Sequence, residues 1–242
     1  MFNGKMKALT FSYDDGVLQD ERLIGIFNKY GLKGTFNINS ELLGKHGSLD
    51  RYGVRVDHTK IQSKDIKSIY QGHEVAVHTL THPNLTELEE SEIIRQVEED
   101  RLNLSRATGY EVYGMAYPCG GVNNDERVAE IIRKQTGVKY ARTITSTYSF
   151  DLQDNLYRFN PTVQHTEWDK LQELVKNFID LKTNKPAILY IWGHSYELDA
   201  EKSWEKFEEI CRDLSCRDDV FYGTNRAVLL KKIIGRKDAK II

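Results

Sequence analysis

Hydrophobic and polar positions follow two alternating periods along the chain. Short runs of apolar, β-branched and aromatic residues, typical of buried strands, are separated by segments with apolar residues every three or four positions, typical of amphipathic helices. The strand patterns lie at 7–12, 34–38, 73–78, 113–117, 139–143, 157–162, 187–192 and 219–222. The helical patterns lie at 18–30, 59–70, 86–107, 124–136, 166–181, 200–213 and 224–234.

This alternation predicts repeated strand–helix units and therefore an α/β fold with a parallel sheet. Seven or eight units in 242 residues suit a (β/α) barrel, which takes about 250 residues, and an open doubly wound sheet is the alternative. No repeat or Pro- and Gly-rich linker interrupts the pattern, so we expect one catalytic domain over residues 1–242. In either architecture, functional residues gather at the carboxyl ends of the strands.

Composition narrows the classes of partner. Lys and Arg number 34 and Asp and Glu 36, so no strong net charge favours nucleic acid or a membrane surface, and we expect neither. The longest clean apolar run, 187–192, is too short to span a bilayer. Three cysteines without CxxC spacing, and no signal-peptide pattern, favour the cytoplasm, although a chain whose leader was removed would look the same. The sequence does not indicate the oligomeric state.

Two carboxylates end the first predicted strand, in the sequence Asp14-Asp15-Gly16. Neighbouring side chains of a strand point to opposite faces, so both carboxylates reach one site only if the chain turns there, and Gly16 permits a sharp turn. A simple solvated Asp-Gly turn is the alternative.

Two histidines, His78 and His82, follow the strand pattern at 73–78. If the segment forms one helical turn, both imidazoles lie on the same face and can bind one ion. With Asp15 they make a two-imidazole, one-carboxylate set, which suits one divalent metal ion with open positions. Zn²⁺ is favoured, and Co²⁺, Ni²⁺, Fe²⁺ and Mn²⁺ are alternatives.

A further histidine, His194, follows the buried strand pattern at 187–192. A structural core histidine is the alternative interpretation. Asp14 then remains as a base and His194 as an acid beside the metal set. These groups suffice for metal-assisted hydrolysis, which needs a Lewis acid, a base for water and a proton donor for the leaving group.

These motifs resemble those of the polysaccharide deacetylases with a NodB-homology domain, carbohydrate esterase family 4. Residues 12–16, SYDDG, resemble the first motif, TFDDG, and residues 78–82, HTLTH, match the second, H-[ST]-x-x-H. Residues 118–120 resemble the end of the third motif, R-x-P-Y-G, and Gly193-His194 lies where the late leucine-x-histidine motif is expected. The resemblance implies a distorted (β/α) barrel of about seven parallel strands. It also implies hydrolysis of acetyl groups, usually N-acetyl, from oligo- or polysaccharides.

The resemblance assigns roles residue by residue. Asp15, His78 and His82 would hold the metal ion. Asp14 would take a proton from the attacking water, and His194 would protonate the departing amine or alcohol.

The third and fourth motifs depart from the family pattern. Cys119 replaces the family tyrosine, and a main-chain N–H of this segment, which includes Tyr117, can still stabilise the oxyanion. Ala116 replaces the arginine that holds the base, and Arg142, at the end of the strand pattern at 139–143, is the candidate replacement, with a surface arginine as the alternative. Residues 151–155 have the spacing of the fourth motif, D-x-x-D-W, without its tryptophan, so we expect a solvated loop there.

Two more polar residues, His165 and Glu197, lie near strand ends. Either could contact sugar hydroxyls or orient His194, and surface positions are the alternative. We therefore expect a metal-dependent carbohydrate deacetylase acting on an acetylated oligosaccharide, at linear amides or at O-acetyl esters. The alternatives are an amide hydrolase of the same fold that opens a cyclic ureide or imide, and a non-catalytic sugar-binding descendant, which only Ala116 supports.

Overall fold

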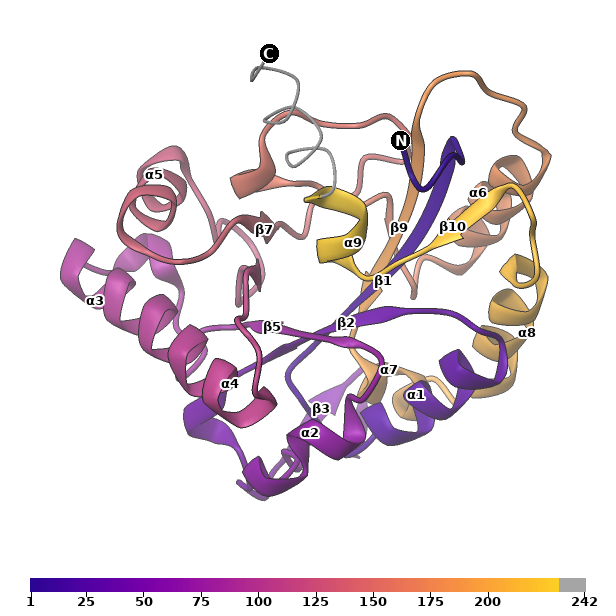
Figure 1. The fold of residues 1–242 in the computed structure, drawn as a ribbon. Helices are drawn as coiled ribbons and strands as arrows, with labels where there is room; N and C mark the ends of the chain where they lie inside the picture. The colour runs from indigo at the N-terminus through magenta and orange to yellow at the C-terminus, as the bar shows by residue number, and fades with distance from the viewer. Residues whose placement is uncertain (231–242) are drawn as a thin grey trace, which may run out of the picture.

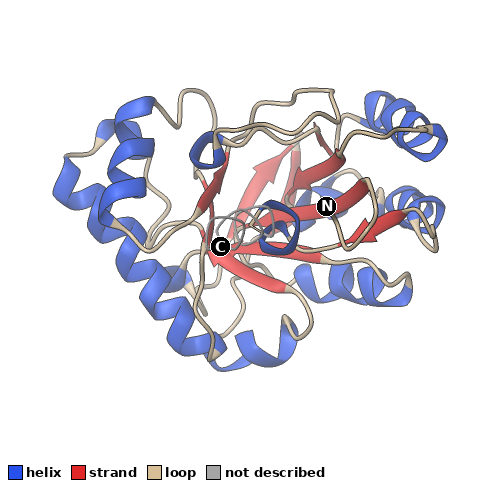
Figure 2. Cartoon of the chain, turned by 45° about the horizontal axis from the view of Figure 1, so that its top comes forward, coloured by secondary structure: helices blue, strands red, loops and turns tan. Residues whose placement is uncertain are grey.

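The computed structural model of the chain describes residues 1–230, and strands occupy its centre with helices around them (Figures 1 and 2). The strands are β1 (Lys7–Asp14), β2 (Gly34–Ile38), β3 (Ser48–Arg51), β4 (Val54–Asp57), β5 (Glu74–Val77), β6 (Gly114–Ala116), β7 (Tyr140–Arg142), β8 (Val163–Gln164), β9 (Ala187–Gly193) and β10 (Val220–Tyr222). The α-helices are α1 (Asp20–Lys29), α2 (Ile66–Ile69), α3 (Glu90–Ile94), α4 (Asp100–Thr108), α5 (Glu126–Gln135), α6 (Trp168–Asp180), α7 (Ser195–Ala200), α8 (Trp204–Leu214) and α9 (Asn225–Leu229). A π-helical segment, Arg95–Glu99, joins α3 to α4.

The main sheet is parallel and has the order β7-β6-β5-β2-β1-β9-β8, with β10 also paired to β1. The irregular segment 159–164 connects its two edges. On one side Phe159 N–H donates to the β7 residue Ala141 (2.9 Å), and on the other Thr162 N–H donates to the β9 residue Tyr190 (2.8 Å). The sheet therefore curls into a distorted barrel, which confirms the expected (β/α) fold of about seven parallel strands and excludes the open doubly wound sheet.

Burial on both faces explains why the strands were visible in the sequence. Every residue of β1, β2, β5 and β9 is buried, and parallel strands covered on both faces form continuous apolar runs. The helices instead bury one stripe each, as α1 does with Leu23, Ile24 and Phe27. Inside the core, the rings of Phe11 and Phe27 lie 4.6 Å apart between centroids.

The structure corrects some predicted elements. The strand expected at 157–162 is reduced to a bridge at Phe159 and the two residues of β8, because Pro161 cannot donate to a strand ladder. The β3–β4 hairpin and α7 were not predicted, since the hairpin is short and mostly exposed. The helix expected at 224–234 begins as α9, and its last residues lie outside the described part of the chain.

The carboxyl ends of the barrel strands gather five of the expected site residues. Asp14 ends β1 and Arg142 ends β7, while His78, Tyr117 and His194 follow β5, β6 and β9. Within residues 1–230, no helix combines the length and the apolar character needed to cross a lipid bilayer.

Candidate metal centre and active site

A sharp turn follows β1 and brings two carboxylates to one cavity. Asp15 and Gly16 have φ angles of 85° and 61°, in the left-handed region that only Gly, and less often Asp or Asn, adopts routinely. Asp15 N–H donates to Asn37 O (2.9 Å) and Ile61 N–H donates to Gly16 O (3.0 Å), which holds the turn in place. As a result Asp14 and Asp15 both line the same cavity.

The two histidines after β5 meet in a loop, so the expected helical turn is wrong. Thr79 and His82 have φ angles of 69° and 65°, outside the helical range. The loop doubles back through a hydrogen bond from His82 N–H to Thr79 Oγ1 (3.1 Å). The rings of His78 and His82 then lie 4.9 Å apart between centroids, close enough for a shared ion.

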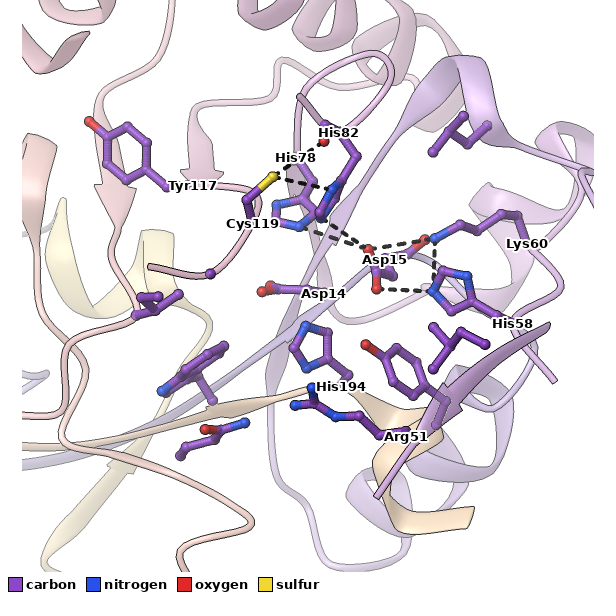
Figure 3. Close-up of a pocket in the computed structure, with 17 residues that line it drawn as sticks. Asp14, Asp15, Arg51, His58, Lys60, His78, His82, Tyr117, Cys119 and His194 are labelled. Carbon is purple, nitrogen blue, oxygen red and sulfur yellow. Dashed lines mark hydrogen bonds and ion pairs between the residues drawn. The ribbon is translucent and has the colours of Figure 1, made fainter. Parts of the chain in front are cut away.

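Asp15, His78 and His82 form one compact cluster (Figure 3). One ligand atom from each lies within 4.8 Å of the others, and Asp15 Oδ1 is 3.9 Å from His78 Nε2 and 3.7 Å from His82 Nε2. His78 Nδ1 lies 2.9 Å from Ala116 O. Because a carbonyl only accepts, Nδ1 carries the hydrogen and the lone pair of Nε2 points to the cluster.

The protonation of these groups also suits a metal ion. Burial lowers the pKa of His78 to about 4 and lowers that of His82 as well. Burial opposes ionisation of Asp15, but His58 and Lys60 outweigh it and hold the pKa of that carboxyl well below its usual value. Two neutral imidazoles and a carboxylate at neutral pH fit a divalent transition-metal ion.

The structure places Arg142 against the carboxylate of Asp14. Both side chains are buried, with 0% and 2% exposed, and Arg142 Nη2 donates to Oδ1 (2.5 Å) and to Oδ2 of Asp14. Asn37 Nδ2 donates to the same Oδ1 (2.7 Å). The Arg142 guanidinium lies 4.5 Å from the ring centre of Trp192. Burial disfavours the charge on Asp14, but Arg142 outweighs it and lowers the pKa of Asp14.

His194 lies beside Asp14 at the start of α7 (Figure 3). Its Nδ1 is 3.1 Å from Glu197 Oε2, which leaves Nε2 as the nitrogen available to the cavity. Burial works against the charged ring, but the Glu197 carboxylate outweighs it and raises the pKa of His194 to about 9. His194 is therefore an imidazolium at neutral pH.

Glu197 and His165 lie behind His194. Both are fully buried, which excludes the alternative of surface positions, and neither lines the cavity. Glu197 Oε2 lies beside the His194 ring, and the expected role of Glu197 in orienting that ring stays a prediction. His165 Nε2 is 3.5 Å from Glu197 Oε2, and its Nδ1 lies 2.9 Å from the Tyr13 hydroxyl. Arg51 Nε, from the β3–β4 hairpin, donates to Glu197 Oε1 (3.0 Å).

A cavity of about 570 Å³ opens beside these groups. Asp15, His78 and His82, together with Asp14 and His194, line one part of it. Its apolar walls come from β9, from α7, from the β3–β4 hairpin and from segments that follow other strands, and include Leu42, Leu49, Ile144, Trp192 and Tyr196. Such a mixture of apolar walls and a few polar groups is typical of a small-molecule site.

The third-motif segment contributes main chain more than side chains. The Tyr117 hydroxyl donates to Tyr157 O (2.7 Å), and its ring points away from Asp14 (Figure 3). Cys119 lines the cavity, and its main-chain N–H has no hydrogen-bond acceptor among the described residues. Residues 151–155 lie outside this cavity with Asp151 and Asp154 exposed, as expected for a solvated loop.

Two cavity residues, His58 and Lys60, were missed by the sequence analysis. His58 Nε2 is 3.1 Å from Asp15 Oδ2, and Lys60 Nζ donates to Asp15 O (2.8 Å). Both follow the hairpin rather than a barrel strand, so a search of strand ends could not find them.

Comparisons with known proteins agree with this geometry. The family model for polysaccharide deacetylase matches residues 2–141. No protein of curated function matches the chain in a sequence comparison. Several solved structures share the fold, among them a deacetylase, an esterase and a pseudoenzyme. The T48 deacetylase with substrate has 16% identity and a TM-score of 0.58, with 96% of this chain and 94% of that one covered. A family 4 acetyl xylan esterase from Clostridium thermocellum in complex with a cobalt ion has 12% identity and a TM-score of 0.56, with 96% and 92% covered.

The third structure is a family 4 pseudoenzyme from Bacillus anthracis, with 21% identity, a TM-score of 0.52, and 95% of this chain and 66% of that one covered. At identities this low, the similarity establishes only a shared fold. The pseudoenzyme shows that a protein can have this fold without catalytic activity. Family membership rests on the sequence model, whose match spans more than half of the chain. It includes Asp14, Asp15, His78 and His82 and ends just before Arg142. The chain belongs to the polysaccharide deacetylase family.

Proposed function

We propose that this chain is a metal-dependent hydrolase that removes acetyl groups, in the first place N-acetyl groups, from an oligosaccharide. The observation that carries the proposal is the arrangement of Asp14, the Asp15–His78–His82 cluster and His194 around one cavity. A fold-level likeness alone would not distinguish an enzyme from a binding protein.

Asp15, His78 and His82 would hold the ion, with Zn²⁺ as the first candidate. A divalent ion bound there supplies a Lewis acid, which polarises an acetyl carbonyl and lowers the pKa of water. The chain supplies the remaining groups.

Asp14 is the proposed base. Its carboxylate is ionised and fixed by Arg142 and Asn37, so it can accept the proton of the attacking water. His194 is the proposed acid, since its raised pKa keeps a proton available for the departing nitrogen or oxygen. The main-chain N–H of Cys119 is the proposed donor to the oxyanion.

Arg142 weakens the case for a non-catalytic descendant. That alternative rested on the missing arginine at Ala116, and Arg142 contacts the same carboxylate from another strand. The substitution therefore leaves the base with a cationic partner.

The test is acetate release by purified protein from acetylated chito-oligosaccharides, peptidoglycan fragments and acetylated xylan. Activity should disappear with a chelator and return with Zn²⁺ or Co²⁺. Asp14→Asn should lower kcat by about 10²–10⁴-fold with the metal content unchanged, and Asp154→Asn, at an exposed carboxylate, is the matched control. A metal-loaded protein that releases no acetate from any of these substrates would contradict the proposal. Hydrolysis of cyclic imides without release of acetate from the sugars would favour the alternative function, an amide hydrolase that opens a cyclic ureide or imide.

A further inference from the structure

The two oxygens of the Asp15 carboxylate have different neighbours. Oδ1 faces His78 and His82, at 3.9 and 3.7 Å. Oδ2 faces away from them and lies 3.1 Å from His58 Nε2. Because a carboxylate only accepts, His58 Nε2 donates in this contact, and the longer 3.4 Å contact of the same nitrogen with Lys60 Nζ then joins two donors. His58 thus engages the one oxygen that the cluster does not use.

The position of His58 is itself fixed. Its ring meets the Tyr196 ring edge to face, at 5.0 Å between centroids and 87°. The segment that carries it is bound to the Asp15–Gly16 turn through main chain, with Leu18 N–H donating to Thr59 O (3.0 Å). Asp15 and His58 are therefore held against each other by backbone as well as by side chains (Figure 3).

Lys60 adds a positive charge at the other oxygen. Its Nζ donates to Asp15 O (2.8 Å) and lies 3.5 Å from Asp15 Oδ1. The side chain is only 6% exposed, so water screens this charge weakly. The ammonium group thus lies beside the oxygen that faces the imidazoles.

We infer that His58 and Lys60 form an outer layer of the metal site, in which His58 strengthens and Lys60 weakens the binding of a divalent ion. The inference rests on the proposed metal site. The His58 hydrogen bond keeps Oδ1 turned to the cluster, and the loss of such an outer partner lowers metal affinity by about 10–100-fold. The Lys60 ammonium repels a divalent cation and competes for Oδ1, so its removal raises affinity, by about tenfold or more.

The experiment measures the dissociation constants of Zn²⁺ and Co²⁺ for the metal-free full chain, by competition with a chromophoric chelator. His58→Ala should bind at least tenfold more weakly, and His58→Gln, which keeps a donor, should recover part of the loss. Lys60→Met should bind about tenfold more tightly, whereas Lys60→Arg, which keeps the charge, should stay near wild type. His46→Ala and Lys45→Met are the controls, because both side chains are exposed outside the cavity. Thermal unfolding of each metal-free variant checks that it folds.

The two opposite shifts distinguish this role from simple support of the loop. Weaker binding in both His58→Ala and Lys60→Met would show a purely structural role and overturn the inference, as would unchanged binding in either. A change in the visible spectrum of bound Co²⁺ in His58→Ala would support it, since that spectrum reports ligand geometry. If the wild type binds neither ion, the metal site fails, and the proposed function with it. If it binds and the variants do not differ, the inference alone fails.

Discussion

Replacement of Arg142 by methionine should disable the proposed base at neutral pH. The guanidinium is fully buried and contacts both carboxylate oxygens of Asp14, Ser12 Oγ at 3.2 Å and the Trp192 ring. Methionine keeps an unbranched apolar side chain but leaves a buried carboxylate without its cation. Breaking a buried pair in this way costs about 3–5 kcal/mol of unfolding free energy while the remaining charge persists.

Asp14 can avoid this cost by taking up a proton. Without Arg142, the largest contribution that now offsets the burial of Asp14 is lost, and loss of an adjacent opposite charge raises a carboxyl pKa by about 1–3 units. Asp14 in wild type has a lowered pKa, so its stabilising contribution is present at neutral pH and disappears only in acid. In Arg142→Met, the loss of base function moves to higher pH. The acid loss of stability disappears, and protonation of Asp14 instead recovers stability as the pH falls through its raised pKa.

The assay is kcat/KM for acetate release over a pH series, paired with denaturant unfolding at each pH. The acidic limb of the profile should move upward by about 1–3 pH units, and Arg158→Met, at a surface arginine paired with Glu126, should leave it in place. The double variant Asp14→Asn/Arg142→Met should be more stable than Arg142→Met alone, because no buried charge is left unpaired. An acidic limb that stays in place in Arg142→Met would refute the role of this arginine in ionising Asp14.

Three other predictions follow from the same end of the barrel. Glu197→Gln should move the alkaline limb of the kcat profile to lower pH by at least about one unit. The reason is that Glu197 raises the pKa of His194 whereas burial lowers it. A limb that does not move would show that Glu197 does not control the pKa of His194. The metal-free chain should lose about 3 kcal/mol of unfolding free energy as the pH rises from 6.5 to about 9. The reason is that His194, whose pKa is raised in the fold, stabilises the folded state only while its ring is protonated. An equal loss of unfolding free energy over the same pH range in His194→Gln would contradict this. Gly193→Ala should destabilise by about 1–3 kcal/mol, since its Cβ would lie 2.3 Å from His165 Nδ1. Gly25→Ala should not destabilise the protein, because the added Cβ has no neighbouring atom within 4 Å. Urea unfolding of the two variants compares their stabilities.

Much of the barrel could be predicted because its pattern is local. β1, β2, β5 and β9 are buried throughout, so each appears as a short segment rich in apolar and β-branched residues. Polar residues that follow such segments gather at one end of a parallel sheet. Asp14, Asp15, His78 and His194 were identified in this way, before any contact between them was known.

Backbone conformation in the loops could not be predicted by periodicity. The spacing of His78 and His82 suggested a helical turn, whereas their approach depends on positive φ at Thr79 and His82. Similarly, positive φ at Asp15 decides that its carboxylate shares a cavity with Asp14. Hydrogen bonds within the loop, as from His82 to Thr79, and between segments, as from Asp15 to Asn37, hold these conformations. Such bonds leave no repeating pattern in the sequence.

The sequence by itself determined the strand–helix alternation, the residue types of the candidate metal site and the candidacy of Arg142. Only the tertiary structure decided which groups meet. β7 and β1 are separated by three strands in the sheet, so Arg142 reaches Asp14 across the interior only because the sheet curls. His58 and Lys60 reach Asp15 because the segment after the hairpin pairs with the turn after β1. Contacts between residues distant in the chain depend on closure of the barrel, and the local period of hydrophobic residues carries no information about that closure.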